Sequence, residues 1–358
     1  MSKFHRLSVA RVEPETRDAV AITFTVPDAL AESFRHAAGQ HLTLRADIEG
    51  QDVRRSYSIC SGAGEGALRI AVKRNAGGLF SAWANERLKA GDTLDVLPPL
   101  GHFGVVLDPS HRKHYVAFAA GSGITPLLSI IRTTLAAEPQ SRFTLFYGNR
   151  ASSTVMFKEE LAALKDIYLT RFNLVHVLSR EAQDIELLHG RIDRVKADAL
   201  MKHWLDLSQV DVVFVCGPDG MMQAVADALK GRGYPDAKVR IERFATSVPR
   251  QEHRPPKPVE AGHGQCEVTV VLEGVTRTFT LEKGNENILE AGLKNGLELP
   301  YSCKSGVCST CRAKLTAGEV DMDVNFALED YEVARGFVLT CQSYPVTDRV
   351  AVDYDQTG

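Results

Sequence analysis

Four cysteines near the end of this 358-residue chain constrain its fold more than any other feature. Cys303, Cys308 and Cys311 lie within nine residues, and Cys341 follows 30 residues later. Gly306, among small serine and threonine neighbours, suits a tight loop whose backbone N–H groups point at sulfur. The spacing therefore predicts one loop that gathers three thiols around a centre and a distant segment that supplies the fourth.

The spacing also restricts the chemistry of that centre. Disulfides need an oxidising compartment, and the chain begins without an apolar signal segment. Structural zinc is usually bound by paired knuckles, and no second Cys or His pair lies near Cys341. The C-x4-C-x2-C…C spacing is typical of a plant-type [2Fe–2S] cluster, which transfers single electrons. We predict such a cluster, and the rival interpretation is a zinc-binding module without catalytic activity.

The composition, with 44% apolar and 24% charged residues, is that of an ordinary globular protein. No apolar stretch is long enough to span a bilayer, so we expect a cytoplasmic protein with no membrane or nucleic-acid partner. Residues 262–358 carry a net charge of −7, which leaves +4 for residues 1–261. This asymmetry favours docking between the two parts or onto a basic partner, although solubility alone also explains it. Three further cysteines, Cys60, Cys216 and Cys266, are expected to be small buried side chains.

The first domain is expected over residues 1–108, where short segments alternate apolar and polar side chains between Gly, Pro and Asp turns. This pattern predicts an antiparallel β-barrel interrupted by one helix at about 80–88. The predicted strands are 8–12, 20–26, 41–46, 53–60, 68–73 and 93–97.

The second domain is expected over residues 109–247, where apolar runs of strand length alternate with helical segments. That rhythm is typical of a doubly wound parallel sheet. The predicted strands are 115–119, 143–147, 174–178, 210–215 and 239–244, and the predicted helices lie near 126–135, 157–165, 191–204 and 221–230.

A proline-rich segment then separates the last domain. Residues 248–264 hold four prolines and almost no large apolar side chain, which predicts a semi-rigid linker. Residues 265–358 form a compact α+β module with strands at 266–272 and 276–281, a helix near 287–294, the cysteine loop and closing strands.

Two motifs of the first domain suit a planar cofactor that carries phosphate. In the run R-R-S-Y-S at 54–58, Arg55 and Tyr57 project from the same side of a strand. A guanidinium can bind a diphosphate with both arms, and an aromatic ring can stack on a planar group, although a strand tyrosine is more often a core residue. Gly78 and Ser81 then lie where a strand leads into a helix, and a helix N-terminus is an anion site.

The second domain contains a glycine motif at the end of its first strand. Gly121 and Gly123, followed by Thr125 and Pro126, let a backbone approach a pyrophosphate and open a helix. An acidic residue that binds an unphosphorylated ribose is expected at the end of the second strand. Instead, Arg150 follows the second strand, and Ser179 and Arg180 follow the third. These residues favour binding of a 2′-phosphate, and therefore NADPH over NADH. The alternative is that the arginines are ordinary solvated surface residues.

Cys216 ends the fourth strand at the carboxyl edge, where open α/β sheets bind ligands. It is a candidate for the nicotinamide pocket, and a buried inert thiol is the competing interpretation. Glu242 and Phe244 close the domain and are candidates to face the planar cofactor. Their alternative is an ordinary last strand with one solvated face.

The chain resembles the ferredoxin–NADP reductase superfamily in five motifs and in their order. These are R-x-Y-S at 55–58, G-x-x-S at 78–81, G-x-G-x-T-P at 121–126, C-G-P at 216–218 and E-x-F at 242–244. The cysteine motif adds a C-terminal plant-type ferredoxin, so the resemblance covers essentially the whole chain. It implies an FAD-binding barrel, an NADP-binding α/β domain and a β-grasp [2Fe–2S] domain.

The resemblance also implies roles for individual residues. Ser58, Thr125, Cys216 and Glu242 would have catalytic roles beside the flavin and the nicotinamide. The residues expected to contact FAD are Arg55, Tyr57, Ser58, Val72, Lys73, Gly78, Ser81 and Phe244. Those expected to contact the nicotinamide nucleotide are Gly121, Gly123, Thr125, Arg150, Ser179 and Arg180. The expected cluster ligands are Cys303, Cys308, Cys311 and Cys341.

Within that superfamily, segments 39–44, 188–192 and 325–342 are most similar to the reductase subunits of multicomponent phenylacetyl-CoA epoxidases. This similarity implies that electrons pass from NADPH through FAD and the cluster to a di-iron oxygenase partner. Because a nicotinamide gives two electrons together and the cluster accepts one, a flavin between them is needed. Reductases of steroid or aromatic oxygenases share this architecture and remain the alternative.

Overall fold

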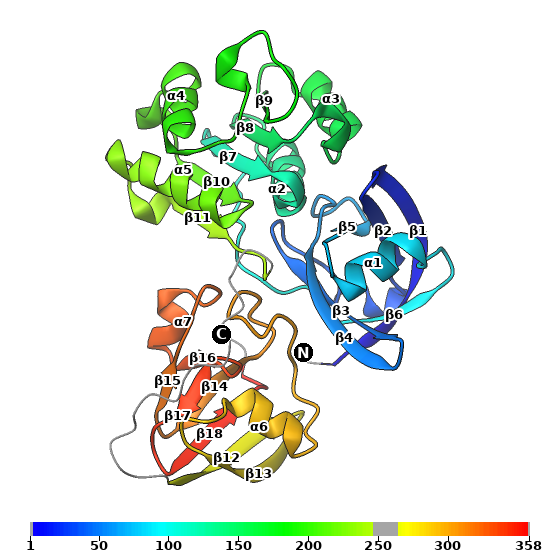
Figure 1. The fold of residues 1–358 in the computed structure, drawn as a ribbon, viewed down its shortest axis with the longest axis vertical. Coiled ribbons are helices and arrows are strands. Elements are labelled where there is room, and N and C mark those ends of the chain that lie inside the picture. Colours follow the sequence, from blue (N-terminus) through cyan, green and yellow to red (C-terminus); the bar gives the residue numbers. More distant parts are fainter. Residues whose placement is uncertain (1–2, 246–263, 357–358) are drawn as a thin grey trace.

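The computed structural model describes residues 3–245 and 264–356, so the predicted linker lies outside the described residues except for Gly264. Three domains follow one another along the chain (Figure 1). In this view the parallel sheet lies at the top, the barrel at the right and the C-terminal domain below. The predicted fold class is confirmed for all three.

The first domain is an antiparallel six-stranded sheet with the order β4-β3-β6-β1-β2-β5. An isolated bridge between Ile59 and Ile70 brings the two ends of the sheet together and closes the barrel. Leu7, Ile22 and Leu42 are fully buried inside it, as the alternation of the strands requires. Its elements are β1 (His5–Thr16), β2 (Ala19–Thr25), β3 (His41–Ile48), β4 (Gln51–Ser58), β5 (Leu68–Lys73), α1 (Leu79–Glu86) and β6 (Thr93–Val96).

The second domain is a parallel sheet with the order β11-β10-β7-β8-β9 and helices between the strands. The predicted last strand, 239–244, is two residues too long, because pairing with β10 ends at Glu242 and Phe244 lies beyond the strand. The elements are β7 (His114–Ala120), α2 (Ile124–Ala137), β8 (Arg142–Asn149), α3 (Lys158–Ile167), β9 (Phe172–Leu178), α4 (Arg194–Trp204), β10 (Val212–Cys216), α5 (Asp219–Gly231) and β11 (Val239–Glu242).

The third domain is a mixed sheet with the order β13-β12-β18-β14-β16, crossed by helix α6 in the manner of a β-grasp. The cysteine loop connects α6 to β14, and Cys341 follows β16, which pairs with β14. The elements are β12 (Gln265–Leu272), β13 (Val275–Glu282), α6 (Ile288–Lys294), β14 (Arg312–Ala317), β15 (Val320–Met322), α7 (Asp330–Ala334), β16 (Phe337–Leu339), β17 (Ser343–Pro345) and β18 (Arg349–Asp353).

The barrel and the parallel sheet share one apolar core. Cys60, Ala71 and Phe103 of the barrel pack in the same buried cluster as Tyr115 and Phe214 of the sheet. Phe103 and Phe214 meet edge to face, with ring centroids 5.5 Å apart. Across the described residues, none of the helices combines the length and the apolar character needed to cross a membrane.

Candidate electron-transfer site

The four predicted ligand thiols converge in the third domain and form two pairs. Cys303 is hydrogen-bonded to Cys308, and Cys311 to Cys341. Cys308, Cys311 and Cys341 are no more than 5% exposed, whereas Cys303 is partly exposed. The neighbouring Cys308 thiol lowers the pKa of Cys303 to about 5.

Backbone and side-chain N–H groups point at these sulfurs. The Ser305 N–H lies 3.3 Å from the sulfur of Cys303, and the Gln342 side-chain amide lies 3.6 Å from that of Cys341. Gly306 has a positive φ of 74°, and a Cβ there would lie 2.9 Å from the Val324 carbonyl, so only glycine fits. N–H groups directed at sulfur are the environment that an iron–sulfur cluster uses.

The pairing of the four thiols bears on whether the site suits a zinc ion or a [2Fe–2S] cluster. Structural zinc needs four ligands around one ion. Two irons bound by two thiolates each need two neighbouring pairs, which is the arrangement of these four cysteines. The donor set therefore fits a [2Fe–2S] cluster.

The predicted flavin residues lie on β4 and at the N-terminus of α1. Arg55 is exposed, and one of its guanidinium nitrogens donates to the Arg54 carbonyl at 2.7 Å. Tyr57 is partly exposed and packs against Phe80 of α1, with ring centroids 5.5 Å apart. The tyrosine ring thus has one supported side, as a stacking platform for a planar ligand requires.

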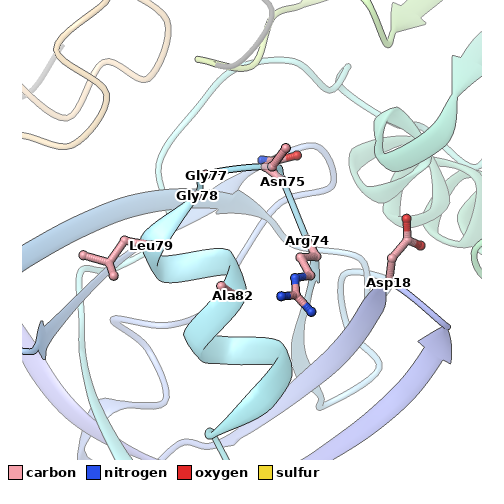
Figure 2. A pocket seen from close by; sticks show the side chains of 8 residues that line it. Asp18, Arg74, Asn75, Gly77, Gly78, Leu79 and Ala82 are labelled. Atoms are coloured by element: carbon pink, nitrogen blue, oxygen red, sulfur yellow. The ribbon is translucent and has the colours of Figure 1, made fainter.

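A pocket of about 430 Å³ opens where β5 leads into α1 (Figure 2). Gly78 lines it, and Ser81 lies beneath, where its hydroxyl accepts from the Asn75 N–H at 3.1 Å and donates to the Gly78 carbonyl at 3.0 Å. A Cβ on Gly78 would lie 2.5 Å from the Ser81 oxygen, so a larger residue would distort this turn. Exposed N–H groups at the start of a helix suit a phosphate.

Sequence reasoning missed Arg74 and Asp18 at this pocket. Arg74 lies between α1 and Asp18 in Figure 2, and it forms an ion pair of 2.6 Å with Glu86. Its position just before the glycines was the available signal. Val72, in contrast, is fully buried, so only its backbone can face a ligand, and Lys73 forms an ion pair of 3.7 Å with Asp18.

Three of the predicted catalytic residues meet where the barrel contacts the parallel sheet. Ser58 donates a hydrogen bond of 3.0 Å to an oxygen of the Glu242 carboxyl group, and β-sheet register places Cys216 directly beside Glu242. Burial raises the pKa of Glu242 to about 8, so its carboxyl holds a proton at neutral pH. Burial also raises the pKa of Cys216, which keeps this fully buried thiol neutral. Phe244 packs partly buried against the shared core.

The glycine loop after β7 lies against the end of β10. A Cβ on Gly123 would lie 2.1 Å from the Cys216 carbonyl, so this contact admits only glycine. Gly121, with φ of 54°, has open space around its Cβ position, and its carbonyl accepts from the Tyr147 hydroxyl at 2.9 Å. Thr125 is buried and donates to the Ser122 carbonyl at 3.0 Å. The loop is therefore fixed on one side and open on the other.

The predicted 2′-phosphate residues lie together at the carboxyl ends of β8 and β9. Arg150 and Arg180 are both exposed, and the Arg180 N–H donates to the Arg150 carbonyl at 2.7 Å. Similarly, the Ser179 N–H donates to the Asn149 carbonyl at 2.9 Å. An acid, Glu181, also lies here and accepts from the Ser152 N–H and hydroxyl at 2.7 and 2.9 Å. Sequence reasoning passed over Glu181, although it directly follows Arg180.

Protein-family comparison assigns each part of the chain. Residues 6–104 match the oxidoreductase FAD-binding domain, residues 118–227 the oxidoreductase NAD-binding domain and residues 270–346 the 2Fe-2S iron-sulfur cluster binding domain. The chain is 46% identical over 358 residues to one of the subunits of the 1,2-phenylacetyl-CoA epoxidase of Escherichia coli (strain K12), an alignment that covers 100% of this chain and 99% of that protein.

The chain belongs to the ferredoxin–NADP reductase superfamily with a C-terminal [2Fe–2S] domain. Members of this family also include the ferredoxin reductase component of 3-ketosteroid-9-alpha-monooxygenase of Rhodococcus rhodochrous, 33% identical over 97% of this chain and 96% of that protein. The solved structure of phthalate dioxygenase reductase, described as a modular structure for electron transfer from pyridine nucleotides to [2Fe–2S], is 26% identical with a TM-score of 0.59 and covers 98% of both chains. The protein is an oxidoreductase that uses FAD, a nicotinamide nucleotide and a [2Fe–2S] cluster.

Proposed function

We propose that this protein is the NADPH-dependent reductase of a multicomponent phenylacetyl-CoA epoxidase and supplies electrons to its di-iron oxygenase component. The observation that carries this proposal is the 46% identity to an epoxidase subunit over nearly the full length of both chains. When bound, the flavin takes two electrons together from the nicotinamide and passes them on singly to the cluster.

The residues of the barrel and of α1 would bind and orient the flavin. Tyr57 would offer the ring face opposite Phe80 for stacking, and the exposed Arg55 would bind a diphosphate. The pocket at the start of α1 presents the Gly78 backbone and the Arg74 guanidinium to phosphate groups. Ser58 and Glu242, hydrogen-bonded to each other, would lie next to the reacting edge and exclude water from it.

The parallel sheet would bind the nicotinamide nucleotide at its carboxyl edge. Gly121 leaves room for a pyrophosphate, and Cys216 and Thr125, both buried, would border the nicotinamide. Arg150 and Arg180 would bind a 2′-phosphate, which favours NADPH. Glu181 would be directed away from this phosphate by its two hydrogen bonds to Ser152.

The test has two stages. Anaerobic addition of NADPH to the loaded protein should bleach the flavin band and then the cluster band. The reduced protein should then support oxygen-dependent epoxidation of phenylacetyl-CoA by the oxygenase component of the epoxidase. Cluster reduction without any turnover of this component would remove the epoxidase assignment and leave the reductase assignment intact.

A reductase for a steroid oxygenase is the second candidate, because the 33% identity to the 3-ketosteroid-9-alpha-monooxygenase reductase also spans nearly the whole chain. Replacing the epoxidase component by the steroid oxygenase component in the same assay distinguishes the two. The assignment to keep is the one whose oxygenase component shows the faster substrate turnover when both components are supplied at equal concentration.

A further inference from the structure

Thr340 connects the two thiols of the buried pair, Cys311 and Cys341. It directly precedes Cys341 and is fully buried. Its hydroxyl donates to the Cys311 carbonyl at 3.0 Å, and its backbone N–H donates to the same oxygen at 3.2 Å. On its other side, the Thr340 carbonyl accepts from the Leu289 N–H of α6 at 3.2 Å. Thr340 is therefore held in one position beside both predicted ligands.

A second buried hydroxyl, that of Tyr354, lies next to Thr340. The phenol oxygen is 2.7 Å from the Thr340 hydroxyl oxygen, and Tyr354 is only 9% exposed. Its backbone N–H donates to the Val271 carbonyl of β12 at 2.9 Å, which fixes the residue at the end of β18. Burial raises the pKa of Tyr354 above its ordinary value, and the nearby thiols of Cys311 and Cys341 add to the rise. The phenol therefore keeps its hydrogen and can donate it.

The direction of these two hydrogen bonds follows from the group at their end. A carbonyl oxygen can only accept, and a threonine hydroxyl has a single hydrogen. Because Thr340 donates that hydrogen to the Cys311 carbonyl, the hydrogen between the two hydroxyl groups must come from Tyr354. Both O–H bonds consequently point their positive ends toward Cys311. Hydrogen bonds aligned in series polarise one another, which strengthens the series.

A neighbouring hydroxyl shows what a merely structural hydrogen bond looks like here. Ser343 is as fully buried as Thr340 and lies two residues after Cys341, but its hydroxyl donates to the Leu339 carbonyl at 2.8 Å. Leu339 is not a predicted ligand. The series from Tyr354 instead ends on the backbone of one, where outer hydrogen bonds and fixed dipoles adjust the properties of a metal centre.

We propose that Thr340 and Tyr354 are positioning residues that make the [2Fe–2S] cluster easier to reduce. Their aligned O–H dipoles direct partial positive charge at Cys311. One electron that enters from the flavin makes the cluster more negative, so these dipoles favour the reduced form. Neither hydroxyl gives up its proton, and no covalent bond breaks. Tyr354 acts through Thr340, and the result is an equilibrium between flavin and cluster that lies further toward the cluster.

This inference goes beyond the proposed function. It rests on the four cysteines as the cluster ligands and does not depend on which oxygenase receives the electrons.

The midpoint potential of the cluster, measured by spectroelectrochemical titration of the loaded whole chain, tests the proposal. Tyr354→Phe keeps the ring and removes the hydroxyl. The equilibrium constant for cluster reduction should fall by about threefold, which makes the potential about 30 mV more negative at about 59 mV per tenfold change. Iron and acid-labile sulfide content should stay at the level of the unchanged protein. Tyr234→Phe is the matched control, because it also removes a buried hydroxyl, which donates to the Val210 carbonyl in the second domain at 3.2 Å.

Variants of Thr340 test whether Tyr354 acts through it. Thr340→Val should lower the potential at least as much as Tyr354→Phe, and Thr340→Ser, which keeps a hydroxyl, should leave it nearly unchanged. Adding Tyr354→Phe to Thr340→Val should cause little further shift, since the connection to Cys311 is already lost. Ser343→Ala removes a buried hydroxyl from the same segment and should leave the potential unchanged.

A second readout follows the electrons within the chain. After anaerobic addition of less than one equivalent of NADPH, the equilibrium constant for transfer of one electron from flavin to cluster should be about threefold smaller in Tyr354→Phe. Tyr234→Phe should give the value of the unchanged protein.

An unchanged potential in Tyr354→Phe with full iron content would overturn the proposal, as would shifts that simply add in the double variant. Loss of iron from Tyr354→Phe would also overturn it, because the residue would then have a structural role. If the unchanged protein shows no cluster signal after reduction with dithionite, the assignment of the four ligands fails instead, so the two failures are distinguishable.

Discussion

The hydroxyl of Ser58 in the barrel donates a hydrogen bond of 3.0 Å to the carboxyl group of Glu242, 184 residues away at the end of the parallel sheet. This contact joins the flavin side of the molecule to the nucleotide side. Cys216 lies directly beside Glu242 in the sheet, so both predicted catalytic residues of the sheet reach the same place. The carboxyl is kept protonated near neutral pH by burial, which raises its pKa to about 8.

Glu242 makes the stability of the protein depend on pH. Its pKa is higher in the folded state than in the unfolded chain, so its contribution to stability is complete below about pH 4.5 and is lost as the pH rises through 8. Glu242→Gln should therefore stabilise the protein relative to the unchanged chain by an amount that grows between pH 5 and 8, by at most about 1.4 kcal/mol per pH unit. Urea unfolding at several pH values measures this. Exposed Glu159→Gln is the control, and a pH-independent difference for Glu242→Gln would contradict the expectation.

Cys308→Ser should prevent assembly of the cluster while leaving flavin reduction by NADPH unchanged. Each of the two thiol pairs would bind one iron, so loss of one thiol would leave one pair incomplete. Iron and acid-labile sulfide analysis, together with the visible spectrum, measures the outcome. The matched control is Cys266→Ser, since Cys266 is buried in the same domain but belongs to strand β12 and not to the predicted ligand set. Full iron content in Cys308→Ser would refute the assignment of this ligand.

Arg150→Ala and Arg180→Ala should each raise the KM for NADPH by about tenfold and leave the KM for NADH nearly unchanged, since a hydrogen bond to a charged group contributes roughly 1.5–3 kcal/mol. Steady-state kinetics with both nucleotides measures these values. Parallel changes for NADPH and NADH would show that the arginines do not recognise the 2′-phosphate.

Gly123→Ala should destabilise the protein by at least about 1–3 kcal/mol, because the added Cβ would lie 2.1 Å from the Cys216 carbonyl and the glycine loop must move away from the end of β10. Gly220→Ala is the matched control. Gly220 lies in the first turn of α5 with no atom within 4 Å of its Cβ position, and the change should stabilise by about 0.4–1 kcal/mol. Thermal unfolding compares the two variants, and equal melting temperatures would show that the loop after β7 can give way.

Features that depend on a few neighbouring residues could be predicted from the sequence alone. The cysteine spacing, the glycines at 121 and 123 and the alternation in β4 each depend on a few neighbouring residues, so they predict the cluster loop, the phosphate loop and the side of the strand that bears Arg55 and Tyr57. Phe244 shows the limit of such reasoning, because the end of a strand depends on pairing with its neighbour rather than on its own residues.

Contacts between distant segments could not be predicted. Thr43 and Thr310 are 267 residues apart, and nothing in either neighbourhood marks them as partners. Arg54 precedes the predicted flavin residue Arg55, yet strand alternation turns it to the opposite face, where it meets Tyr301. Glu181 was passed over because an isolated acid in a loop resembles any solvated charge.

The apolar cluster shared by the barrel and the parallel sheet has a consequence for protein engineering. Phe103 completes the core of the neighbouring sheet, so neither of these domains can be exchanged alone without leaving a cavity in the other. The ferredoxin-like domain keeps its own core and can be replaced as a cassette. New electron-transfer chains are therefore best assembled by keeping the first two domains of this reductase together and varying the third.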